Sequence, residues 1–260
     1  MKIGFIGGGN MAIALVGGLI RRGFAGADII VAEPVETQRN RLHQEFGVGV
    51  EAAAAATLRA EVIVLAVKPQ VLRQVVADWP RLDAGTCVLS IAAGIRARDI
   101  ARWLQGHAAV VRAMPNTPAL VGAGVTGLYA LPGVSADQRA QAEAILGAVG
   151  ATVWVDSDES IDAVTAISGS GPAYVFLFME ALQAAAQALG LDSATARTLT
   201  LQTFRGASEL AVSGNDEPAE LRARVTSKGG TTERGVAALE AGRVREIIAE
   251  AARAAHTRAH

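Results

Sequence analysis

A glycine-rich turn between an apolar run and a helical pattern constrains the fold of this chain more than any other feature. The turn reads Gly7-Gly8-Gly9-Asn10-Met11-Ala12, a G-x-G-x-x-A spacing that directly follows the strand-like residues 2–6. Gly7 permits a tight turn, Gly9 lets the backbone approach a pyrophosphate, and Ala12 keeps the helix close to the strand. The N–H groups at the helix N-terminus favour an anion. In this setting the turn predicts dinucleotide binding rather than a plain glycine-rich connection.

The first 155 residues alternate short β-branched runs with helical patterns. Most of the runs are apolar throughout, which is typical of strands covered on both faces. This alternation predicts an α/β fold with a Rossmann-type, doubly wound, mostly parallel sheet. The expected strands are 2–6, 29–32, 62–66, 87–91, 109–113, 124–129 and 152–155, with a weaker one near 48–50. The expected helices between them are 10–22, 35–46, 70–77, 97–104 and 136–149.

The sequence pattern changes after Asp156, where strand patterns end and helical periodicity takes over. Helices are expected at 158–167, 173–189, 193–213, 218–225, 232–241 and 244–258. We therefore expect two domains, a dinucleotide-binding domain over residues 1–157 and an all-helical domain over residues 158–260. The run from Tyr174 to Leu189 is apolar but shorter than a bilayer span, and it carries Glu180, so we expect a buried helix there.

Composition narrows the functional classes. The chain has 260 residues, of which 51% are hydrophobic and 19% charged, so disorder is excluded. The mean hydropathy of +0.30 predicts a large core or a face buried against another chain. The net charge of −1 predicts no nucleic-acid or anionic-membrane partner. Cys87 is the single cysteine, and no Cys/His cluster suggests a metal. These features fit a reducing cytoplasm, and the glycine turn interrupts the apolar run that a signal peptide needs.

An acidic residue ends the second expected strand. Glu33 lies 21 positions after Ala12, where a carboxylate would bind the ribose hydroxyls of NAD and repel the extra phosphate of NADP. Arg39 and Arg41 follow on the next helix, and either is a candidate to answer that phosphate. The alternative is a solvated charge at a strand end. We expect Glu33 to bias the protein toward NADH.

Three more strand ends carry candidate site residues, because open α/β sheets bind ligands at the carboxyl ends of their strands. Ala66-Val67-Lys68-Pro69 places a lysine there, which is either a ligand for the cofactor or an ordinary surface lysine. Ala92-Ala93-Gly94 has side chains small enough for a flat ring to lie against the backbone. Met114-Pro115-Asn116-Thr117-Pro118 is stiffened by its prolines, and its asparagine is either a site residue or part of a structural turn.

Two glycine-containing segments interrupt the helical half. Ser168-Gly169-Ser170-Gly171-Pro172 predicts a break in a helix, made for the close approach of either a ligand or another backbone. Val225-Thr226-Ser227-Lys228-Gly229-Gly230-Thr231-Thr232 leads into a helix with two glycines and several hydroxyls. This pattern predicts a second N-terminal nest for a small carboxylate. The alternative is simple N-capping by Thr231 or Thr232.

No strong acid–base pair is visible in the sequence. The histidines lie outside every motif, so each is expected to be a surface or hydrogen-bonded residue: His43, His107, His256 and His260. A hydroxyacid dehydrogenase with a His–Asp pair is therefore disfavoured. The pattern favours chemistry that a cofactor performs itself, aided by orientation and a weak proton donor.

Together these motifs resemble those of the pyrroline-5-carboxylate reductase family, from residue 3 to about residue 258. The segments that carry the resemblance are, in order, IGFIGGGNMA, AVKPQ, RAMPNTPA, ISGSGPAYVF and VTSKGGTT. The resemblance implies hydride transfer from NADPH or NADH to the C=N carbon of 1-pyrroline-5-carboxylate, giving L-proline in the last step of proline biosynthesis. It also implies a helical half that dimerises, often into decamers built as pentamers of dimers, with each active site at a subunit junction.

The resemblance also assigns roles to residues. Those implied to bind the cofactor are Ile6, Gly7, Gly8, Gly9, Asn10, Met11, Ala66, Val67, Lys68 and Pro69, with Ala93, Gly94 and Asn116 near the nicotinamide. Those implied to hold the substrate carboxylate are Ser227, Gly230, Thr231 and Thr232. Thr232 is also the implied proton donor to the ring nitrogen. Because a threonine hydroxyl is a poor acid, it is expected to relay or position a proton, with water or pre-protonation as the alternative.

Two departures from the family pattern bear on function. Lys228 stands where many relatives have proline, which adds a cation beside the anion site, and Glu33 replaces a small polar residue, which leaves the cofactor preference open. Two other functions remain as alternatives. One is another small Rossmann reductase acting on a keto or hydroxy acid. The other is a non-catalytic dinucleotide sensor acting through its dimer face, which the second anion nest disfavours.

Overall fold

The computed structural model describes residues 1–259 of the chain. These residues divide into two compact units. Unit 1 comprises Met1–Ser170 together with the residues from Ala255 onward, and unit 2 comprises Gly171–Ala254. The predicted domain boundary after residue 157 stays a prediction.

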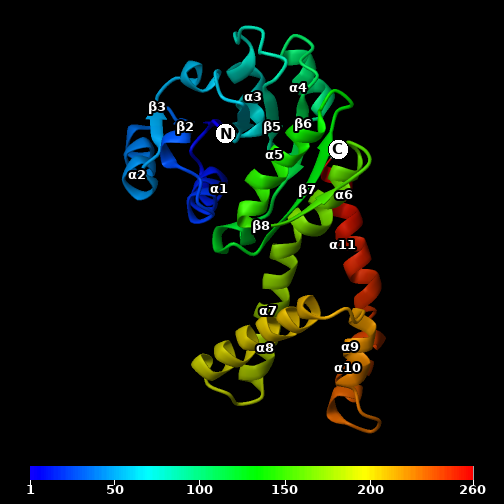
Figure 1. The fold of residues 1–260 in the computed structure, drawn as a ribbon. Coiled ribbons are helices and arrows are strands. Elements are labelled where there is room, and N and C mark those ends of the chain that lie inside the picture. The colour runs from blue at the N-terminus through cyan, green and yellow to red at the C-terminus, as the bar shows by residue number, and fades with distance from the viewer. Residues whose placement is uncertain (260) are drawn as a thin grey trace. The chain divides into compact units, whose positions relative to one another are not determined.

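Unit 1 is built on one eight-stranded sheet with the order β3-β2-β1-β4-β5-β6-β7-β8 (Figure 1). The strands are β1 (Ile3–Ile6), β2 (Ile29–Ala32), β3 (Gly49–Glu51), β4 (Val62–Leu65), β5 (Cys87–Ser90), β6 (Val110–Met114), β7 (Gly124–Ala130) and β8 (Gly150–Trp154). All neighbouring pairs are parallel except β6 and β7. The chain runs outward from β1 to β3 and then returns to β4 on the other side of β1. The carboxyl ends of β1 and β4 therefore form a topological switch point, where such sheets bind ligands.

Helices cover both faces of this sheet, as the uniformly apolar strands predict (Figure 1). They are α1 (Asn10–Arg21), α2 (Glu36–Phe46), α3 (Pro69–Val76), α4 (Ala97–Trp103), α5 (Ala136–Leu146) and α6 (Ser160–Val164). One core joins Phe5 and Val64 of the sheet to Leu15 of α1, and the other joins Ile63 to Leu72 of α3 and Ile100 of α4. Adjacent strand residues thus point to opposite faces, each into its own core. The predicted doubly wound fold is confirmed.

The local sequence explains where several of these helices begin. Pro69 opens α3, where its fixed φ fits and no backbone donor is lost. Ser135 caps α5 through a capping box, in which its hydroxyl accepts from the N–H of Gln138 and the side chain of Gln138 accepts from its N–H. The helix predicted over 136–149 ends at Leu146, because a 3₁₀ turn, Gly147–Val149, leads into β8.

The α-helix is interrupted close to where the sequence predicts it, between Val164 and Gly171, but the interruption is a π turn and not an end of the helical run. After α6 the backbone forms a π-helical turn, Thr165–Gly169, in which the N–H of Ser170 bonds the carbonyl of Thr165 at 2.8 Å. The π turn accommodates an extra residue, so the helix continues instead of ending before Pro172. Gly169 lies within this turn, where an added Cβ would be 2.8 Å from the Cε of Met114. The glycine is therefore explained by close packing inside unit 1.

Unit 2 is helical and lightly buried. Its elements are α7 (Gly171–Ala188), α8 (Ser193–Ser213), α9 (Pro218–Arg224), α10 (Thr231–Ala241) and the greater part of α11 (Val244–Ala259). Asp192 caps α8 by accepting from the N–H groups of Ala194 and Thr195. Within the described chain α7 has no fully buried residue, and Phe176 and Leu177 are more than half exposed. The prediction of a buried helix over residues 174–189 is therefore wrong for the single chain.

One helical run is as long and apolar as a membrane span. It covers Ser160–Ala188, 29 residues, with a mean hydropathy of 1.3 in its most apolar window, only 17% of which is buried. The predicted short segment is thus also wrong in length, because the π turn joins two helical stretches. A helix this apolar and this exposed also occurs where another subunit covers it.

Candidate active site

The glycine turn takes the shape that its sequence predicts. Gly7 has a φ of +99°, and an added Cβ would lie 2.8 Å from the carbonyl oxygen of Ala66, so only glycine fits there. The N–H of Gly7 bonds the carbonyl of Ala32 at 2.8 Å, which ties the turn to β2. Gly9 caps α1 without a side-chain bond, and an added Cβ there would meet no atom within 4 Å. The free N–H groups of α1 therefore face open space that an anion can enter.

A cavity of about 600 Å³ lies at the topological switch point. Seven of the predicted cofactor residues line it: Ile6, Gly7, Gly9, Glu33, Ala66, Val67 and Lys68. Apolar side chains of α3, Val71 and Val75, complete the wall. An apolar cleft that carries a glycine turn, with a carboxylate bonded beside it at the end of β2, matches the parts of a dinucleotide. The residues present therefore fit the nucleotide cofactor that the sequence predicts.

Glu33 forms part of the wall and is held by the backbone. Its carboxylate accepts from the N–H of Gly8 at 2.8 Å and from the N–H of Val35 at 2.9 Å. Gln38 supports the same turn from α2, because its side-chain amide donates to the carbonyl of Gly8 at 2.7 Å. The bond between Glu33 and Gly8 joins the end of β2 to the glycine turn, a link that the sequence motif alone does not indicate.

The two arginines that follow Glu33 are already engaged. Arg39 donates from Nη1 to the backbone carbonyls of Glu33 and Pro34, at 2.8 and 2.7 Å. Arg41 pairs with Glu45 one helical turn along α2, at 3.2 Å. Arg39 therefore satisfies two carbonyls of the β2–α2 turn, and Arg41 pairs with Glu45, which does not line the cavity.

The remaining predicted cofactor residues lie near this edge of the sheet. Lys68 is exposed and is the N-cap residue of α3. Ala93 and Gly94 are exposed after the end of β5. Gly8, Asn10 and Pro69 are adjacent in sequence to residues that line the cavity, and Met11 is one residue further along α1, whereas Ala93, Gly94 and Asn116 lie outside the lining.

Asn116 is buried, and both ends of its amide have protein partners. Its Oδ1 accepts from the N–H of Val125 at 3.0 Å, and its Nδ2 donates to the carbonyl of Ser168 at 3.1 Å. These bonds connect the segment after β6 to β7 and to the π turn. They give direct support to the structural role that the sequence left open, and a contact with nicotinamide stays a prediction.

A buried ionic cluster lies beneath this region and was not predicted. Arg112 of β6 is 1% exposed and donates to Asp158 at 2.6 Å and to Asp162 at 2.9 Å. Asp162, fully buried, also binds Arg96 at 2.7 Å, and Asp158 accepts from the N–H of Ala97 at 2.9 Å. The cluster joins α6 to the sheet and to the start of α4. The sequence signal for this cluster is the arginine within the apolar run 109–113, because a charge in a buried strand requires an oppositely charged partner.

The second predicted site, in unit 2, forms a nest at the start of α10. Gly230 is the N-cap residue and no side chain caps the helix, so the alternative of capping by Thr231 or Thr232 is wrong. Both threonines are exposed. The N–H of Gly230 bonds the carbonyl of Ser227 at 3.0 Å, and Gly229 has a φ of +75°. The hydroxyls and the first N–H groups of α10 are thus available to a carboxylate.

Glu233 is a residue of this nest that the sequence analysis missed. Its carboxylate accepts from the N–H of Gly229 at 2.7 Å, reaching back over the first turn of α10. The spacing of an acid after the Gly-Thr-Thr sequence resembles a capping box and was the available signal. The bond holds Gly229 in place and leaves the N–H groups of the helix itself unoccupied by this acid.

Two of the histidines bond to backbone carbonyls. His43 bonds Val48, and the buried His107 bonds Thr86 at 2.8 Å. His256 lies on α11 with an interaction of its own, and His260 lies outside the described residues. Within residues 1–259, no group of three or more His, Cys, Asp or Glu side chains is arranged for a metal.

Comparison with known proteins identifies the family. The profile described as pyrroline-5-carboxylate reductase dimerisation matches residues 158–260, and that described as coenzyme F420-dependent NADP oxidoreductase matches residues 2–94. A pyrroline-5-carboxylate reductase of Pseudomonas aeruginosa is 47% identical over 259 residues, covering 99% of this chain and 95% of that protein. The chain belongs to the pyrroline-5-carboxylate reductase family.

Solved structures agree with this assignment. A pyrroline-5-carboxylate reductase from Coxiella burnetii has a TM-score of 0.92 at 43% identity, covering 99% of this chain and 97% of that one. A Plasmodium falciparum pyrroline carboxylate reductase, solved with NADP bound, has a TM-score of 0.86 at 27% identity, covering 100% and 97%. The protein is an NAD(P)H-dependent oxidoreductase that reduces the C=N bond of 1-pyrroline-5-carboxylate to give L-proline.

The family assignment also explains the exposed helices of unit 2. A pyrroline-5-carboxylate reductase forms homo-oligomers through its helical region, which here includes α7 to α11. Apolar side chains of α7 and α11 line a cavity of about 340 Å³ that includes Leu177, Phe178, Ile247 and Ile248. Exposed apolar surface of this kind is typical of subunit interfaces. Exposed apolar surface of this kind contributes to the high mean hydropathy.

Proposed function

We propose that the reductase binds its cofactor in the cavity at the switch point, with the pyrophosphate against Gly7, Gly8, Gly9, Asn10 and Met11. The observation that supports this is the open space over Gly9 at the N-terminus of α1. Ile6, Ala66, Val67, Lys68 and Pro69 lie along the cofactor, and Ala93, Gly94 and Asn116 lie near the nicotinamide. When bound, the cofactor supplies the hydride. Replacing Gly9 with alanine tests this assignment, because the added methyl group enters the space reserved for phosphate.

We further propose that the cofactor is preferentially NADH. Glu33 provides a carboxylate at the end of β2, where it can accept from both ribose hydroxyls. A 2′-phosphate at that position would meet this negative charge. Nη1 of Arg39 bonds two backbone carbonyls and Arg41 pairs with Glu45, so both arginines already have partners other than a phosphate. The ratio of kcat/KM for NADH to that for NADPH measures the preference.

The substrate carboxylate is proposed to bind the nest at the start of α10. Ser227, Thr231 and Thr232 offer hydroxyls, and Gly230 offers no side chain that would block the first N–H groups of the helix. The charge of the helix N-terminus favours a carboxylate. Lys228 is exposed beside the nest and, within residues 1–259, forms no ion pair, so it adds a favourable charge.

The reaction needs little chemistry from the protein. The hydride reaches the imine carbon, the electron pair of the C=N bond passes to nitrogen, and the nitrogen carries a proton in the product. Thr232 positions or relays that proton, because its hydroxyl is a poor acid by itself. The larger contribution is orientation, which the nest provides for the substrate carboxylate and the nucleotide site provides for the nicotinamide.

A substitution at Thr232 tests this mechanism. Thr232→Ala is expected to lower kcat more than it raises the KM for the cofactor, because the hydroxyl acts on the substrate. Thr226→Ala is a matched control, since Thr226 donates to the carbonyl of Arg222 and is outside the proposed carboxylate set. Wild-type turnover of the pyrroline by Thr232→Ala would refute the positioning role.

The finer points of organisation are proposals of the same kind. We propose a boundary near residue 157 between a dinucleotide-binding domain and a helical domain for substrate binding and dimerisation, and homodimers that assemble into decamers. Light scattering after size exclusion distinguishes dimer from decamer. A cytoplasmic location is supported by the single buried cysteine, Cys87, and fractionation of cells tests it.

A further inference from the structure

A second cavity of unit 1, open to solvent on one side, lies at the amino ends of β5 and β6, away from the strand ends that adjoin the nucleotide site. It has a volume of about 250 Å³ and is lined by the segments that precede β5 and β6, together with Gly133 after β7. The nucleotide cavity instead adjoins the carboxyl ends of β1, β2 and β4. None of the proposed cofactor or substrate residues lines the second cavity. This cavity is therefore separate from the machinery of the reaction described above.

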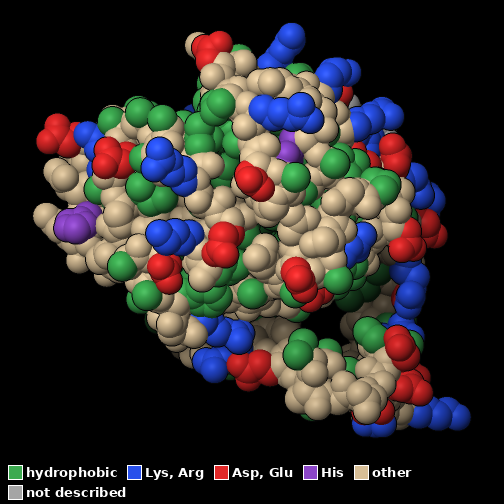
Figure 2. All heavy atoms as spheres, turned by 45° about the horizontal axis from the view of Figure 1, so that its top comes forward, with side chains coloured by type: hydrophobic (Ala, Val, Ile, Leu, Met, Phe, Trp, Pro, Cys, Tyr) green, Lys and Arg blue, Asp and Glu red, His purple; other side chains and the backbone are tan. Residues whose placement is uncertain are grey.

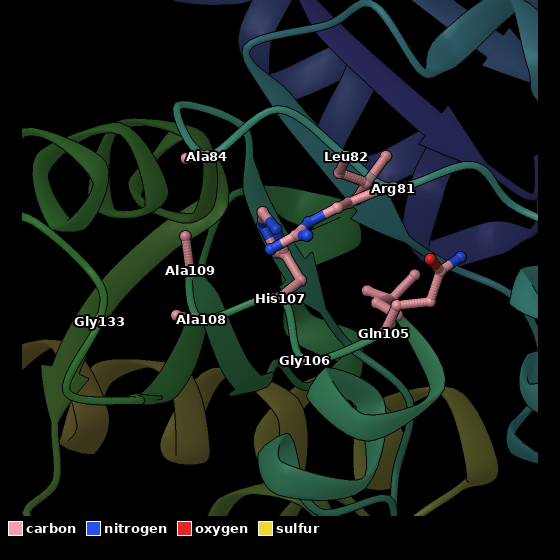
Figure 3. A pocket seen from close by; sticks show the side chains of 10 residues that line it. Arg81, Leu82, Ala84, Gln105, Gly106, His107, Ala108, Ala109 and Gly133 are labelled. Carbon is pink, nitrogen blue, oxygen red and sulfur yellow. The ribbon is translucent and has the colours of Figure 1, made fainter.

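Two side chains give the cavity its chemistry. Figure 3 shows the Arg81 side chain extending toward the imidazole of His107 across the cavity. Arg81 is exposed and, in the part of the chain described, has neither an ion pair nor a hydrogen bond. Asp83 is close in sequence, but its carboxylate accepts from the N–H of Gly85 at 2.7 Å and does not line the cavity. The guanidinium is thus free to bind a carboxylate in a bidentate manner.

The hydrogen bond of His107 determines what its ring offers. His107 is 9% exposed, and its Nε2 lies 2.8 Å from the carbonyl oxygen of Thr86. Because a carbonyl oxygen can only accept, Nε2 must carry the hydrogen. In the neutral ring Nδ1 then presents a lone pair, and within residues 1–259 it has no hydrogen-bond partner. The cavity therefore combines a cation for a carboxylate with an acceptor for an N–H group.

The remaining walls limit the size of a ligand. The nearby amide of Gln105 is oriented by the carbonyl of Trp79, which accepts from Nε2 at 2.9 Å. Leu82, Leu104 and Ala109 contribute apolar surface. At about 30 Å³ for each water-sized group, the cavity holds about eight such groups, the size of a small amino acid.

We propose that this cavity is a binding site for a small amino acid, separate from the active site. The carboxylate of the ligand pairs with Arg81, and its ammonium donates to Nδ1 of His107. L-Proline is the natural probe, because it has this size and charge pattern and is the product of the enzyme. Its binding at the cavity does not depend on the roles proposed for the nest at the start of α10.

The test measures L-proline binding to the full-length enzyme by calorimetry, together with crystals soaked in L-proline. The wild-type protein is expected to bind L-proline at the cavity in addition to any at the active site. Arg81→Gln is expected to weaken the cavity site about 10- to 100-fold, as for the loss of a hydrogen bond to a charged group. Arg73→Gln, at an exposed arginine of α3 outside the cavity, is expected to leave this binding unchanged.

A second variant and a second ligand test the contact between His107 and the ammonium group. His107→Gln keeps a donor for Thr86 but removes the Nδ1 acceptor, so it should lose cavity binding without losing thermal stability. If that variant does not fold, Arg81→Gln carries the test, since within residues 1–259 the Arg81 side chain forms no hydrogen bond or ion pair whose loss would destabilise the fold. Cyclopentanecarboxylate has the same ring and carboxylate without the nitrogen and should bind the cavity more weakly.

The proposal is overturned if Arg81→Gln binds L-proline with wild-type stoichiometry and affinity, or if soaked crystals show L-proline only elsewhere. Equal cavity binding of cyclopentanecarboxylate would also overturn it as an amino-acid site. The kcat and KM of Arg81→Gln for the pyrroline should match those of the wild type. This readout keeps the failure of the cavity proposal distinct from failure of the proposed active site.

Discussion

Removing the charge of Glu33 should change the cofactor preference of the enzyme. In the structure the carboxylate lines the nucleotide cavity and accepts from the N–H groups of Gly8 and Val35. We consider two replacements, Glu33→Ser, which removes the carboxylate and its reach, and Glu33→Gln, which removes the charge but keeps an acceptor for Gly8. Their comparison separates the charge from the anchoring of the glycine turn.

The magnitude follows from the contacts that are lost and the repulsion that is relieved. A hydrogen bond to a charged acceptor contributes about 1.5–3 kcal/mol, so losing one ribose bond lowers kcat/KM for NADH about 10- to 100-fold. Two like charges about 4 Å apart near a protein surface repel by up to about 4 kcal/mol. Because Glu33 is partly exposed, salt reduces this repulsion, and we expect NADPH to gain about 10-fold. The ratio of the two efficiencies should therefore move about 100-fold or more toward NADPH.

The assay is oxidation of each cofactor with saturating 1-pyrroline-5-carboxylate, followed at low and high ionic strength. Glu36→Ser is a matched control, because Glu36 is exposed on the first turn of α2 and does not line the cavity. Both Glu33 variants should show the shift, and it should shrink at high salt. An unchanged ratio in Glu33→Gln and Glu33→Ser would remove the carboxylate from cofactor selection.

Three further predictions concern the turn, the buried charges and the thiol. Gly7→Ala should lower the free energy of unfolding by about 1–3 kcal/mol because of its φ of +99°, whereas Gly9→Ala should leave it unchanged and only raise the cofactor KM; denaturant titration with kinetics compares them. Asp162→Ala should destabilise the protein by about 3–5 kcal/mol, because it leaves Arg112 buried beside a lost partner, and a loss below about 1 kcal/mol in urea unfolding would contradict this. Burial raises the pKa of Cys87 to about 12, so above pH 9.0 the thiol ionises in the unfolded chain before it does in the folded one. The free energy of unfolding should therefore fall above pH 9.0, by up to about 1.4 kcal/mol per pH unit, and Cys87→Ala should reduce this slope.

The charges on one face of the molecule are mixed in sign. Figure 2 shows acidic and basic side chains interspersed over the face in view, in keeping with a net charge of −1. Specificity for small ligands therefore depends on local groups such as Glu33, Arg81 and the start of α10, rather than on long-range attraction.

Local sequence was sufficient for most of the fold. The strands and helices of unit 1 appear where the apolar runs and periodic patterns predict them, because strands buried on both faces leave an unambiguous signal. The glycine turn was also readable, since a positive φ and a close backbone approach at Gly7 admit only one residue type. The glycine-containing turn before α10 also lies where the sequence predicts it, although the helix begins one residue earlier than predicted, at Thr231.

Ion pairs between residues far apart in the chain could not be predicted in the same way. The sequence around Arg112 does not indicate that it pairs with Asp158 and Asp162, because these partners are 46 and 50 positions away. The π turn could not be predicted from the sequence, because glycine and proline ordinarily end a helix. Here the close packing of Gly169 against Met114 allows the helical run to accommodate an extra residue.

The sequence by itself determined the doubly wound sheet, the glycine turn at its first helix and the small-residue nest before α10, because each depends on neighbours in the chain. Only the tertiary structure decided which charges are free to act. It bonded Arg39 to backbone carbonyls, buried Arg112 among carboxylates and, among residues 1–259, left Arg81 without an ion pair, because folding and not adjacency in sequence brings the partners of a charge together.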